Sequence, residues 1–502
     1  MSSPVKNGVQ CLLVPVCEAH PGWIDLYQAA WRIAASNVTA PAVPGWKPQM
    51  CCLPGAPNIW LWDSCFMTFF ARYGDGIVPV MNNLDNLYRL QREDGFLSMA
   101  YAMESGKPAY GERINPPLLA WAELNYWKFS GDEGRLRDVL PRLVSFFDWI
   151  KANRRRKSGL YWFEDSGSTG MDNSPRSGYL SEHLNGSDIC HVDLAAQQAL
   201  SAECISTMAR HLGEAALADR FYAEHRAIVE VLNRYHWDSQ TGFYYDVFNR
   251  DEPTERHNFV NHKTVAAFWP LMAGCCCTEQ RESLLKHLLN PEEFWTKHPV
   301  ASLSKDDPNF DPAGAYWLGG VWAPINYMIA KALRREGRPD LARQLAVSHL
   351  EAMSAVFQSR EYSGIWEAYA PEAFLPATHK PSINFTDQSP FILSAETIVR
   401  PNVVGWSGLG PIAMLIEDIL GFDFDAPANR ITWDIRTRGL HGIKDFPFQG
   451  GRISLIASDQ GASGNGVQIS AINERDVTLV LLVNGTPQSE RLLQAGTHSF
   501  PL

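Results

Sequence analysis

The sequence of 502 residues contains no run of about 18 consecutive apolar residues, the length that a membrane-spanning helix needs. Between Met1 and Cys17 there is one Lys and a short apolar patch, without the long apolar segment and cleavage site of a secretory signal. We therefore expect a cytoplasmic protein with no membrane partner.

Positive charge is also scarce. The chain has 44 Lys and Arg against 55 Asp and Glu, a formal net charge of −11. Nucleic acids and anionic surfaces attract clustered Lys and Arg, so this balance argues against a nucleic-acid partner. An uncharged small substrate is compatible with it.

The ten cysteines do not form a disulfide framework, because no C-x-x-C pair occurs and three of them, Cys275 to Cys277, are consecutive. Cys65 and Cys204 lie in apolar stretches with helical periodicity. We expect reduced, buried thiols, which fits the cytoplasm.

Motifs for metals and cofactors are missing as well. There is no His-Glu-x-x-His zinc motif and no Gly-x-Ser-x-Gly nucleophile elbow. Gly408 to Ala413 has the spacing of a dinucleotide loop, but no strand precedes it and a Pro interrupts it. Asp307 to Asp311 resembles the start of a calcium loop that lacks its later Gly and Glu. We expect neither a metal nor a cofactor.

Helical periodicity dominates the chain before Gly421. Apolar residues recur three and four positions apart in twelve segments, which predict twelve helices. They are 23–35, 61–72, 78–92, 117–128, 132–150, 191–211, 213–235, 261–272, 278–289, 320–335, 339–357 and 405–420. Twelve helices make six pairs, so we predict an all-α (α/α)6 barrel with long loops at one end; an irregular helical bundle is the alternative.

The pattern changes after Gly421. Arg452 to Ala457 and Val477 to Val483 are alternating or β-branched, and Asn484-Gly485 is a strong hairpin signal because both residues tolerate positive φ. We predict two domains, a barrel over residues 1–424 and a small all-β, sandwich-like domain over 425–502.

Two carboxylates stand among aromatic residues and turn formers, Asp172 in Gly-Met-Asp-Asn-Ser-Pro-Arg and Glu367 in Trp-Glu-Ala-Tyr. The chain is rich in rings, with 17 Trp and 16 Tyr. Such rings either fill a helical interior or pack against sugar faces. Two acids on opposite sides of a sugar can divide the cleavage of a glycosidic bond, one donating a proton and one activating water.

Five separated blocks carry a resemblance to a known family. They are 60–64 (WLWDS), 112–117 (ERINPP), 170–176 (GMDNSPR), 316–326 (YWLGGVWAPIN), and 366–372 (WEAYAPE) together with 404–407 (VGWS). In this order they resemble glycoside hydrolase family 63 with its mannosylglycerate and glucosylglycerate hydrolase relatives, and more distantly the trehalases of family 37. The resemblance covers roughly residues 60–420.

The resemblance implies roles for particular residues. Asp172 matches the family's general acid, Glu367 its general base, and Asp63 a carboxylate that binds sugar hydroxyls. The substrate-binding set that we carry over is Trp60, Trp62, Asp63, Arg113, Asn115, Trp317, Gly319, Trp322, Tyr369 and Trp406.

The chain also departs from the family pattern. Asn115 stands where the family has Gln, Ala368 replaces an Asn, and the segment 373–403 is longer than in compact relatives. Structural alternatives remain for single residues: Asp63 favoured by a helix dipole, Asp172 capping its own turn, and Trp322 packing in the core.

Together these features predict an inverting, exo-acting α-glycosidase for a small, α-glucosidic saccharide or glycoside, and they leave a homo-oligomer open. Inversion requires roughly 6.5 to 9.5 Å between the two carboxyl groups. Alternatives are an α-L-rhamnosidase-like hydrolase, a non-catalytic carbohydrate-binding barrel, or a sugar epimerase using paired bases among His183, His191, His257 and His262.

Overall fold

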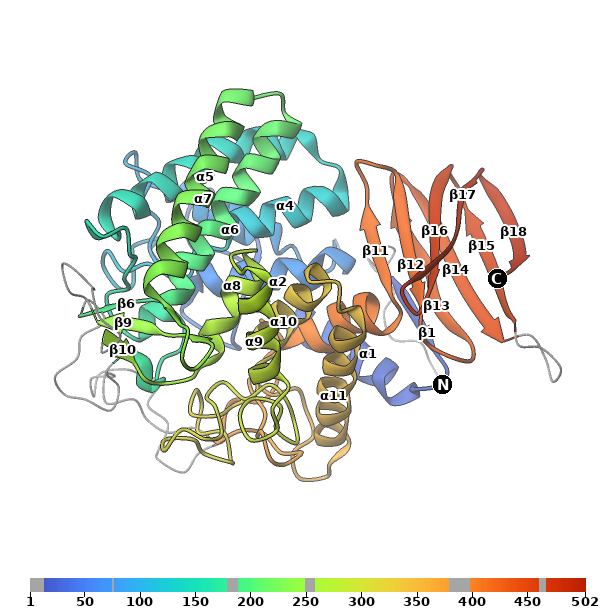
Figure 1. Cartoon of the computed structure of the whole chain (residues 1–502). Helices are drawn as coiled ribbons and strands as arrows, with labels where there is room; N and C mark the ends of the chain where they lie inside the picture. Colours follow the sequence, from blue (N-terminus) through green and yellow to red (C-terminus); the bar gives the residue numbers. More distant parts are fainter. Residues whose placement is uncertain (1–12, 75, 178–187, 249–257, 379–397, 460–465) are drawn as a thin grey trace.

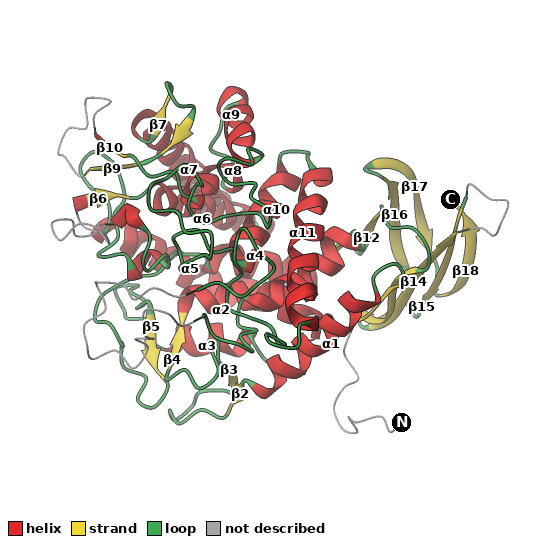
Figure 2. Ribbon diagram, turned by 90° about the horizontal axis from the view of Figure 1, so that it is seen from below, coloured by secondary structure: helices red, strands yellow, loops and turns green. Residues whose placement is uncertain are grey.

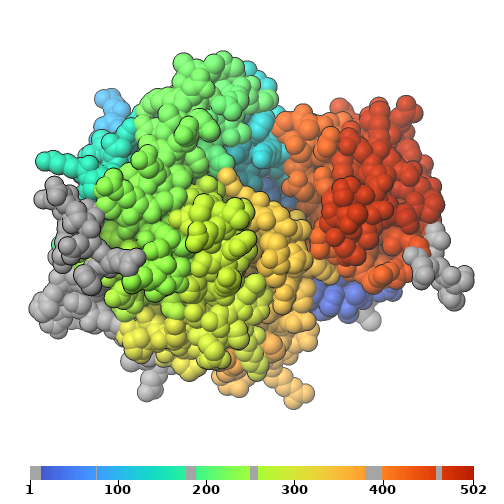
Figure 3. Space-filling view, viewed as in Figure 1, coloured from blue at the N-terminus to red at the C-terminus, as the bar shows by residue number. Residues whose placement is uncertain are grey.

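The chain folds into a large helical region and a smaller region of β-strands that lie side by side (Figure 1). The computed structural model describes residues 13–74, 76–177, 188–248, 258–378, 398–459 and 466–502. In the space-filling view the β region forms a separate lobe, red, against the helical body (Figure 3). No helix of the described residues is both long enough and apolar enough to pass through a lipid bilayer.

The inner helices of the described chain form a closed ring. They contact one another in the order α2 (Leu61–Ala71), α4 (Leu119–Ser130), α6 (Val192–His211), α8 (Trp269–Met272) and α10 (Ala323–Arg335). The short η7 (Ser407–Leu409) and the π-helix η8 (Gly410–Ile419) then close the ring between α10 and α2. Every residue of α2 is buried, as expected for a helix surrounded by protein.

Outer helices alternate with the inner ones along the chain. They are α1 (Pro21–Ser36), α3 (Met81–Arg89), α5 (Glu133–Asn153), α7 (Ala215–Tyr235), α9 (Thr278–Leu288) and α11 (Pro339–Gln358). The helix α7 buries only Ala218, Phe221, Ile228 and Leu232, a single stripe at helical spacing. This stripe packs on α6, residues at its edges are partly buried, and the opposite face of α7 is exposed.

Each of the twelve helical segments predicted from periodicity has a counterpart among the described helices. The predicted start of the helix at residue 132 agrees with the start of α5. The Asp132 side chain accepts a hydrogen bond from Arg135 N at 2.9 Å and caps this helix. The segment 261–272 is less regular than predicted. It begins as extended chain and then forms η6 (Val265–Phe268) and the four-residue α8.

The expected class, all-α, is wrong. The protein is 42% helical and 21% strand. Besides the β region, short strands pair within the helical region: β2 (Val38–Thr39) with β3 (Gln49–Met50), β4 (Asn58–Trp60) with β5 (Ala100–Ala102), β7 (Trp237–Asp238) with β8 (Phe243–Tyr244), and β9 (Asp246–Phe248) with β6 (Ile189–Cys190) and β10 (Phe259–Val260). Figure 2 shows these pairs among the loops. Long loops over a helical ring satisfy their backbone groups by pairing with one another.

Two sheets make up the β region. The five-stranded sheet has the order β1 (Val14–Cys17), β13 (His441–Phe448), β14 (Gly451–Asp459), β15 (Val467–Asn473) and β18 (Gly496–Pro501). The four-stranded sheet has the order β11 (Phe422–Asp425), β12 (Arg430–Ile435), β16 (Val477–Val483) and β17 (Thr486–Leu493).

The predicted strand signals are confirmed in this region. The run 452–457 lies in β14, and 477–483 is β16. Asn484 and Gly485 join β16 to β17 with φ of 50° and 78°. The strand β1, from the other end of the chain, was not expected: Val14 pairs with Lys444 and Cys17 with His441. The division of the chain at residues 424 and 425 stays a prediction.

Candidate active site

The segments that carry the candidate residues all precede the N-terminal ends of inner helices. Trp60 is the residue before α2, Asn115 precedes α4, Asp172 precedes α6, Trp322 is the residue before α10, and Trp406 precedes η7. Successive inner helices are linked through an outer helix, so their N-terminal ends lie at the same end of the ring. The fold therefore gathers five distant segments at one end.

Gly170 seats the Asp172 loop on an aromatic ring. Its φ is +76°, and a Cβ added there would lie 2.3 Å from the ring of Trp62. Only glycine combines this backbone conformation with so close an approach. Asp172, two residues later, is half-buried.

Arg176 fixes the other end of the same loop. The guanidinium is buried and donates to Asp193 at 2.7 and 2.6 Å and to Asp246 at 2.6 and 3.0 Å. Asp193 lies in the first turn of α6 and Asp246 in β9. Paired, charge-assisted bonds of this kind hold a planar group in one orientation. The loop that presents Asp172 is therefore fixed at both ends.

Glu367 is buried, with 3% of its surface exposed, and is held from several sides. The Tyr316 hydroxyl donates to Glu367 Oε1 at 3.1 Å, and the Arg400 backbone N–H approaches Oε2 at 3.5 Å. The Glu367 carbonyl accepts from Trp406 Nε1 at 3.2 Å and from the Ser407 hydroxyl at 3.4 Å. Trp406 thus positions the Glu367 backbone.

The two carboxyl groups have contrasting electrostatic surroundings. Burial raises the pKa of Asp172 well above its usual range, and the negative charges of Glu367, Asp63 and Asp165 raise it further. Burial also raises the pKa of Glu367, but the Arg400 charge and the Tyr316 hydroxyl oppose that rise. Within the described residues no hydrogen bond joins the two carboxyl groups. Asp172 is therefore the group that better retains a proton.

Asp63 belongs to the same cluster. It lies in the first turn of α2 and is 7% exposed. Burial raises its pKa to about 7, the Cys52 thiol lowers it by hydrogen bonding, and the Glu367 charge raises it. Near neutral pH this carboxyl can therefore both donate and accept hydrogen bonds.

Four tryptophans form a wall beside the carboxyl groups. Trp317 stacks on Trp322 with ring centroids 4.1 Å apart and an interplanar angle of 5°. Trp62 lies 6.3 Å from Trp317 and 6.0 Å from Trp406, and Trp322 lies 5.6 Å from Trp406. The indole N–H groups of Trp62 and Trp322 have no hydrogen-bond partner among the described residues. Both rings are buried, with 3% of Trp62 and 0% of Trp322 exposed, so Trp322 packs in the core.

The half-buried Trp60 ring packs against Tyr110 at a centroid distance of 5.2 Å. Burial raises the pKa of Tyr110, and the Asp172 charge adds to the rise. These two rings therefore approach the Asp172 side of the site. Neither contact involves the four-tryptophan wall.

Several predicted binding residues have other contacts in this structure. Arg113 is exposed, and its Nε lies 2.8 Å from Asp165 Oδ2. Asn115 is buried and donates to Ser168 O at 3.3 Å, while its Oδ1 has no described partner. The Tyr369 hydroxyl accepts from Trp366 N at 3.1 Å. Tyr369 thus supports the backbone next to Glu367.

Gly319 stands at a position where the backbone conformation and close packing require a glycine. Its φ is +146°, and a Cβ there would lie 2.8 Å from Asp311 O. Its N–H donates to the Ser302 hydroxyl at 3.2 Å. Gly319 therefore shapes the turn that carries Trp317 and Trp322.

Sequence reasoning missed Tyr316, Arg400 and Cys52 as neighbours of the carboxyl groups. Tyr316 stands beside Trp317 in a block already singled out, and this adjacency was the available signal. Arg400 carried no local signal, because it reaches Glu367 through the pairing of residues 366 and 401.

Some predicted features lie largely outside the described residues. Most of the segments 178–190 and 373–403, expected near the leaving group, fall there, as do His183 and His257. His191 is buried and its Nδ1 accepts from Phe163 N at 3.2 Å, and burial lowers its pKa to about 3. His262 pairs with Asp307 at 2.8 Å. Among the described residues no group of three or more His, Cys, Asp or Glu side chains could hold a metal ion.

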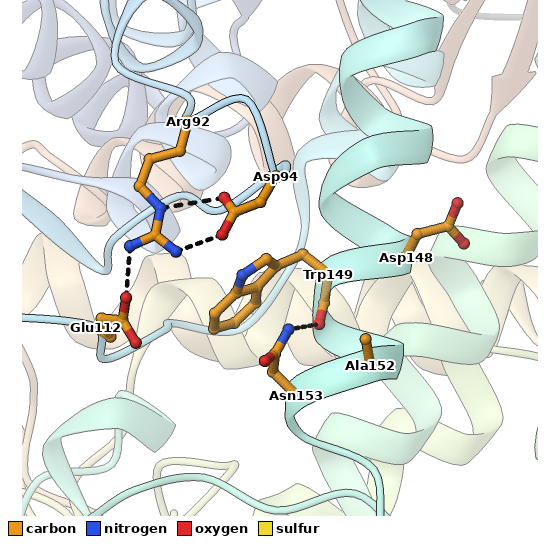
Figure 4. A pocket seen from close by; sticks show the side chains of 7 residues that line it. All are labelled: Arg92, Asp94, Glu112, Asp148, Trp149, Ala152 and Asn153. Atoms are coloured by element: carbon orange, nitrogen blue, oxygen red, sulfur yellow. Dashed lines mark hydrogen bonds and ion pairs between the residues drawn. The ribbon is translucent and has the colours of Figure 1, made fainter.

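A separate cavity of about 340 Å³ lies elsewhere on the helical region (Figure 4). It is lined by Arg92, Asp94, Glu112, Asp148, Trp149, Ala152 and Asn153. Arg92 pairs with Asp94 and Glu112, and Asn153 donates to Trp149 O at 2.8 Å. The cavity contains neither Asp172 nor Glu367, and its charged groups largely satisfy one another.

Two curated relatives illustrate how far the sequence likeness extends. The chain is 26% identical over 402 residues to an uncharacterized protein of Borreliella burgdorferi, covering 79% of each chain. It is 26% identical to a probable mannosyl-oligosaccharide glucosidase of Schizosaccharomyces pombe, covering 47% of this chain. The match spans only 32% of that longer relative.

Solved structures share the fold at low identity. The mannosylglycerate hydrolase of family 63 from Thermus thermophilus, in complex with Tris and D-glycerate, matches with a TM-score of 0.58 and 19% identity, covering 77% of this chain and 99% of that one. A family 78 rhamnosidase of Bacillus sp. GL1 matches with a TM-score of 0.67 and 14% identity, covering 96% of this chain and 43% of that one. At these identities the likeness concerns the fold.

A family model gives the decisive match. The description of that family is the mannosylglycerate hydrolase MGH1-like glycoside hydrolase domain, and it matches residues 56–378. These residues include Asp63, Asp172 and Glu367. Because the match spans more than half of the chain, the protein belongs to this family of glycoside hydrolases and is a glycosidase.

Proposed function

We propose that the protein is an inverting, exo-acting α-glycosidase in which Asp172 is the general acid and Glu367 the general base. The observation that carries this proposal is the contrast between two neighbouring carboxyl groups, one crowded by negative charge and one supplied with donors. When two carboxyl groups have pKa values that differ because of their surroundings, the group with the higher pKa is assigned as the acid and the other as the base.

Asp172 suits the role of the acid. Burial and three neighbouring carboxylates raise its pKa well above the usual range, which favours its protonated form. It accepts no hydrogen bond from its own turn within the described residues. Asp238 shows the contrasting arrangement, because it accepts from Gln240 N at 3.0 Å and from Thr241 N at 3.3 Å. Turn capping therefore does not account for Asp172.

Glu367 suits the role of the base. The Tyr316 hydroxyl, the Arg400 N–H and the Arg400 charge all favour its ionised form. In the proposed single step, Glu367 takes a proton from water as the water oxygen bonds to the anomeric carbon. The bond from that carbon to the glycosidic oxygen breaks, and Asp172 gives that oxygen its proton. The sugar leaves with inverted configuration.

The substrate that we favour is a small α-glucosidic glycoside. The half-buried ring of Trp60, beside Tyr110, can offer an apolar face to a sugar, and the carboxyl of Asp63 can bind two neighbouring hydroxyls. Relatives carry names of mannosyl-oligosaccharide glucosidases and of mannosylglycerate hydrolases, so glucose and mannose are the first sugars to compare.

The experiment is a screen of 4-nitrophenyl α-glucoside, α-mannoside and α-rhamnoside together with mannosylglycerate and glucosylglycerate. Proton NMR of the first product then gives its anomeric configuration. We expect release of β-configured sugar, with the α-glucosides preferred. Release of α-configured sugar would exclude inversion, preferred cleavage of the α-rhamnoside would favour the rhamnosidase alternative, and binding without turnover would favour a carbohydrate-binding protein.

A further inference from the structure

Asn173, the residue after the proposed acid, contacts the loop that supports the proposed base. Its Nδ2 donates to Ala315 O at 2.9 Å, and its Oδ1 accepts from Trp317 N at 2.8 Å. The side chain is completely buried. One amide therefore binds the backbone on both sides of Tyr316.

The Tyr316 segment needs such support. Ala315 and Tyr316 have φ of +37° and +67°, a conformation that non-glycine residues rarely adopt. A strained backbone of this kind persists only where its surroundings hold it. Thr378 and Gly320 supply further bonds: the Thr378 hydroxyl accepts from Ala315 N at 3.1 Å, its carbonyl accepts from Tyr316 N at 2.8 Å, and Gly320 N donates to Tyr316 O at 3.0 Å.

The conformation held in this way directs the Tyr316 side chain at Glu367. The Tyr316 hydroxyl donates to Glu367 Oε1 at 3.1 Å, and its ring packs against Trp322 at a centroid distance of 4.8 Å. A hydrogen bond donated to a carboxylate favours its charged form. The state of Glu367 thus depends on where the loop 315–317 lies.

We propose that Asn173 is a positioning residue that couples the two halves of the active site: it holds Tyr316 in its strained conformation, so that the Tyr316 hydroxyl keeps its hydrogen bond to Glu367 and orients that carboxyl group. Asn173 touches neither carboxyl group in this scheme. It acts through the backbone of residues 315 and 317. The kinetic part of this inference rests on the proposed function.

The first test compares Asn173→Ala with Tyr316→Phe on 4-nitrophenyl α-glucoside. Asn173→Ala should lower kcat about 100-fold, the effect of misplacing a catalytic group by about 1 Å, with KM changed less than about threefold. The acidic limb of the kcat profile should move up by about one pH unit in both variants, because Glu367 loses one hydrogen bond to its charged form. The double variant should have the same acidic limb as Tyr316→Phe alone.

Asn86→Ala is the matched control. Asn86 is also completely buried, and its amide accepts from Lys47 N at 2.9 Å and donates to Lys47 O at 3.0 Å. It therefore binds a loop backbone in the same way, away from the carboxyl groups. Asn86→Ala should lower the melting temperature without moving the acidic limb. An unchanged limb in Asn173→Ala, or additive shifts in the double variant, would overturn the proposal.

A crystal structure of Asn173→Ala gives a readout that needs no turnover. We expect the loop 315–317 to relax and the Tyr316 hydroxyl to leave Glu367, while Asp172 stays in place. If Tyr316 still contacts Glu367 at the same distance, Asn173 is not the positioning residue, whatever the substrate is. If the wild type cleaves no glycoside, the proposed function fails while this structural test still decides the inference. Where Asn173→Ala does not fold, Asn173→Ser serves, because its shorter side chain cannot reach both backbone groups.

Discussion

Two buried clusters of charge within the same ring of helices shift the pKa of one carboxyl group each in opposite directions, upward for Asp172 and downward for Glu417. At the end that carries the candidate site, burial raises the pKa values of Asp63, Asp172 and Glu367, and the Glu367 charge raises those of Asp63 and Asp172 further. Near the C-terminal ends of the inner helices, Glu417 of η8 is surrounded by cations and hydroxyls. Burial alone would raise its pKa, but Lys331 and Arg72 lower it to about 2.

The contacts explain the difference. Arg72 lies 2.8 Å from Glu417 Oε1, the Tyr73 hydroxyl donates to the same oxygen at 2.8 Å, and Lys331 pairs with the other oxygen. Arg334 pairs with the neighbouring Asp418 at 2.5 Å. Burial is common to Asp172 and Glu417, so the cations paired with Glu417 account for its lowered pKa. A buried carboxylate with matched cations serves stability, and one such as Asp172 that lacks them favours its protonated form and suits acid chemistry.

The largest effect should come from removing the proposed proton donor of the candidate active site, Asp172. Asp172→Asn should lower kcat on a natural glycoside by about 10²- to 10⁴-fold, the range for loss of a general acid. Activity on a substrate with a strongly acidic leaving group should fall much less, because such a group needs no proton. Asp238→Asn, which removes a turn-capping carboxylate, is the control and should retain wild-type kcat. Equal losses on both substrates would argue against the acid role.

Removing Glu417 from the second charged cluster should lower the stability of the fold. Glu417→Ala leaves the largely covered cations of Arg72 and Lys331 without their partner, and the free energy of unfolding should fall by about 3–5 kcal/mol. Denaturant or thermal unfolding measures this loss, with the exposed Glu230→Gln on α7 as the control. A loss no larger than that of the control would mean that the cluster contributes little to stability.

The pH dependence of stability should also distinguish Glu417 from Asp172. The pKa of Glu417 is lowered from 4.5 to about 2, so its contribution to stability is full above about 4.5 and disappears as the pH falls toward 2. Asp172 behaves oppositely: its raised pKa disfavours the folded state once the unfolded carboxyl ionises above 3.8. Melting curves of Glu417→Gln should thus lose much of the acid dependence, whereas Asp172→Asn should be more stable than wild type at neutral pH. Parallel curves for both variants would contradict the assignment.

The smallest effect concerns Arg400, a cation that acts on Glu367. Arg400 lowers the pKa of Glu367 by its charge, so Arg400→Met should raise that pKa and shift the acidic limb of kcat to higher pH. We expect a shift of less than about one unit, because half-exposed charges are screened by solvent. Arg338→Met, which removes an exposed arginine that pairs with Asp340, should leave the limb in place.

Much of the fold could be predicted because its signals are local. Apolar spacing located the helices, and Asn484-Gly485 located a hairpin, since both depend on neighbours within a few positions. The short strand pairs and β1 escaped prediction. Val14 and Lys444 meet through pairing between distant segments, and nothing in a segment of four residues specifies its partner.

In the candidate site, too, only the features with a local sequence signal could be predicted. The motif around Asp172 and the block around Glu367 directed attention to two carboxyl groups that the structure brings within electrostatic reach of each other. Their neighbours could not be predicted. Tyr316 reaches Glu367 across 51 positions and Asn173 reaches Trp317 across 144, and each contact depends on loop conformations that composition does not reveal.

The pairing of β1 with β13 has a consequence for the order of folding. During synthesis Val14 leaves the ribosome before the helices of the described residues, whereas its partner Lys444 emerges after them. Closing so long a loop is slow and entropically unfavourable, while the helices form from nearby residues. Among the described strands, the one translated first is therefore among the last to be paired, and the helical region can assemble before β1 joins its sheet.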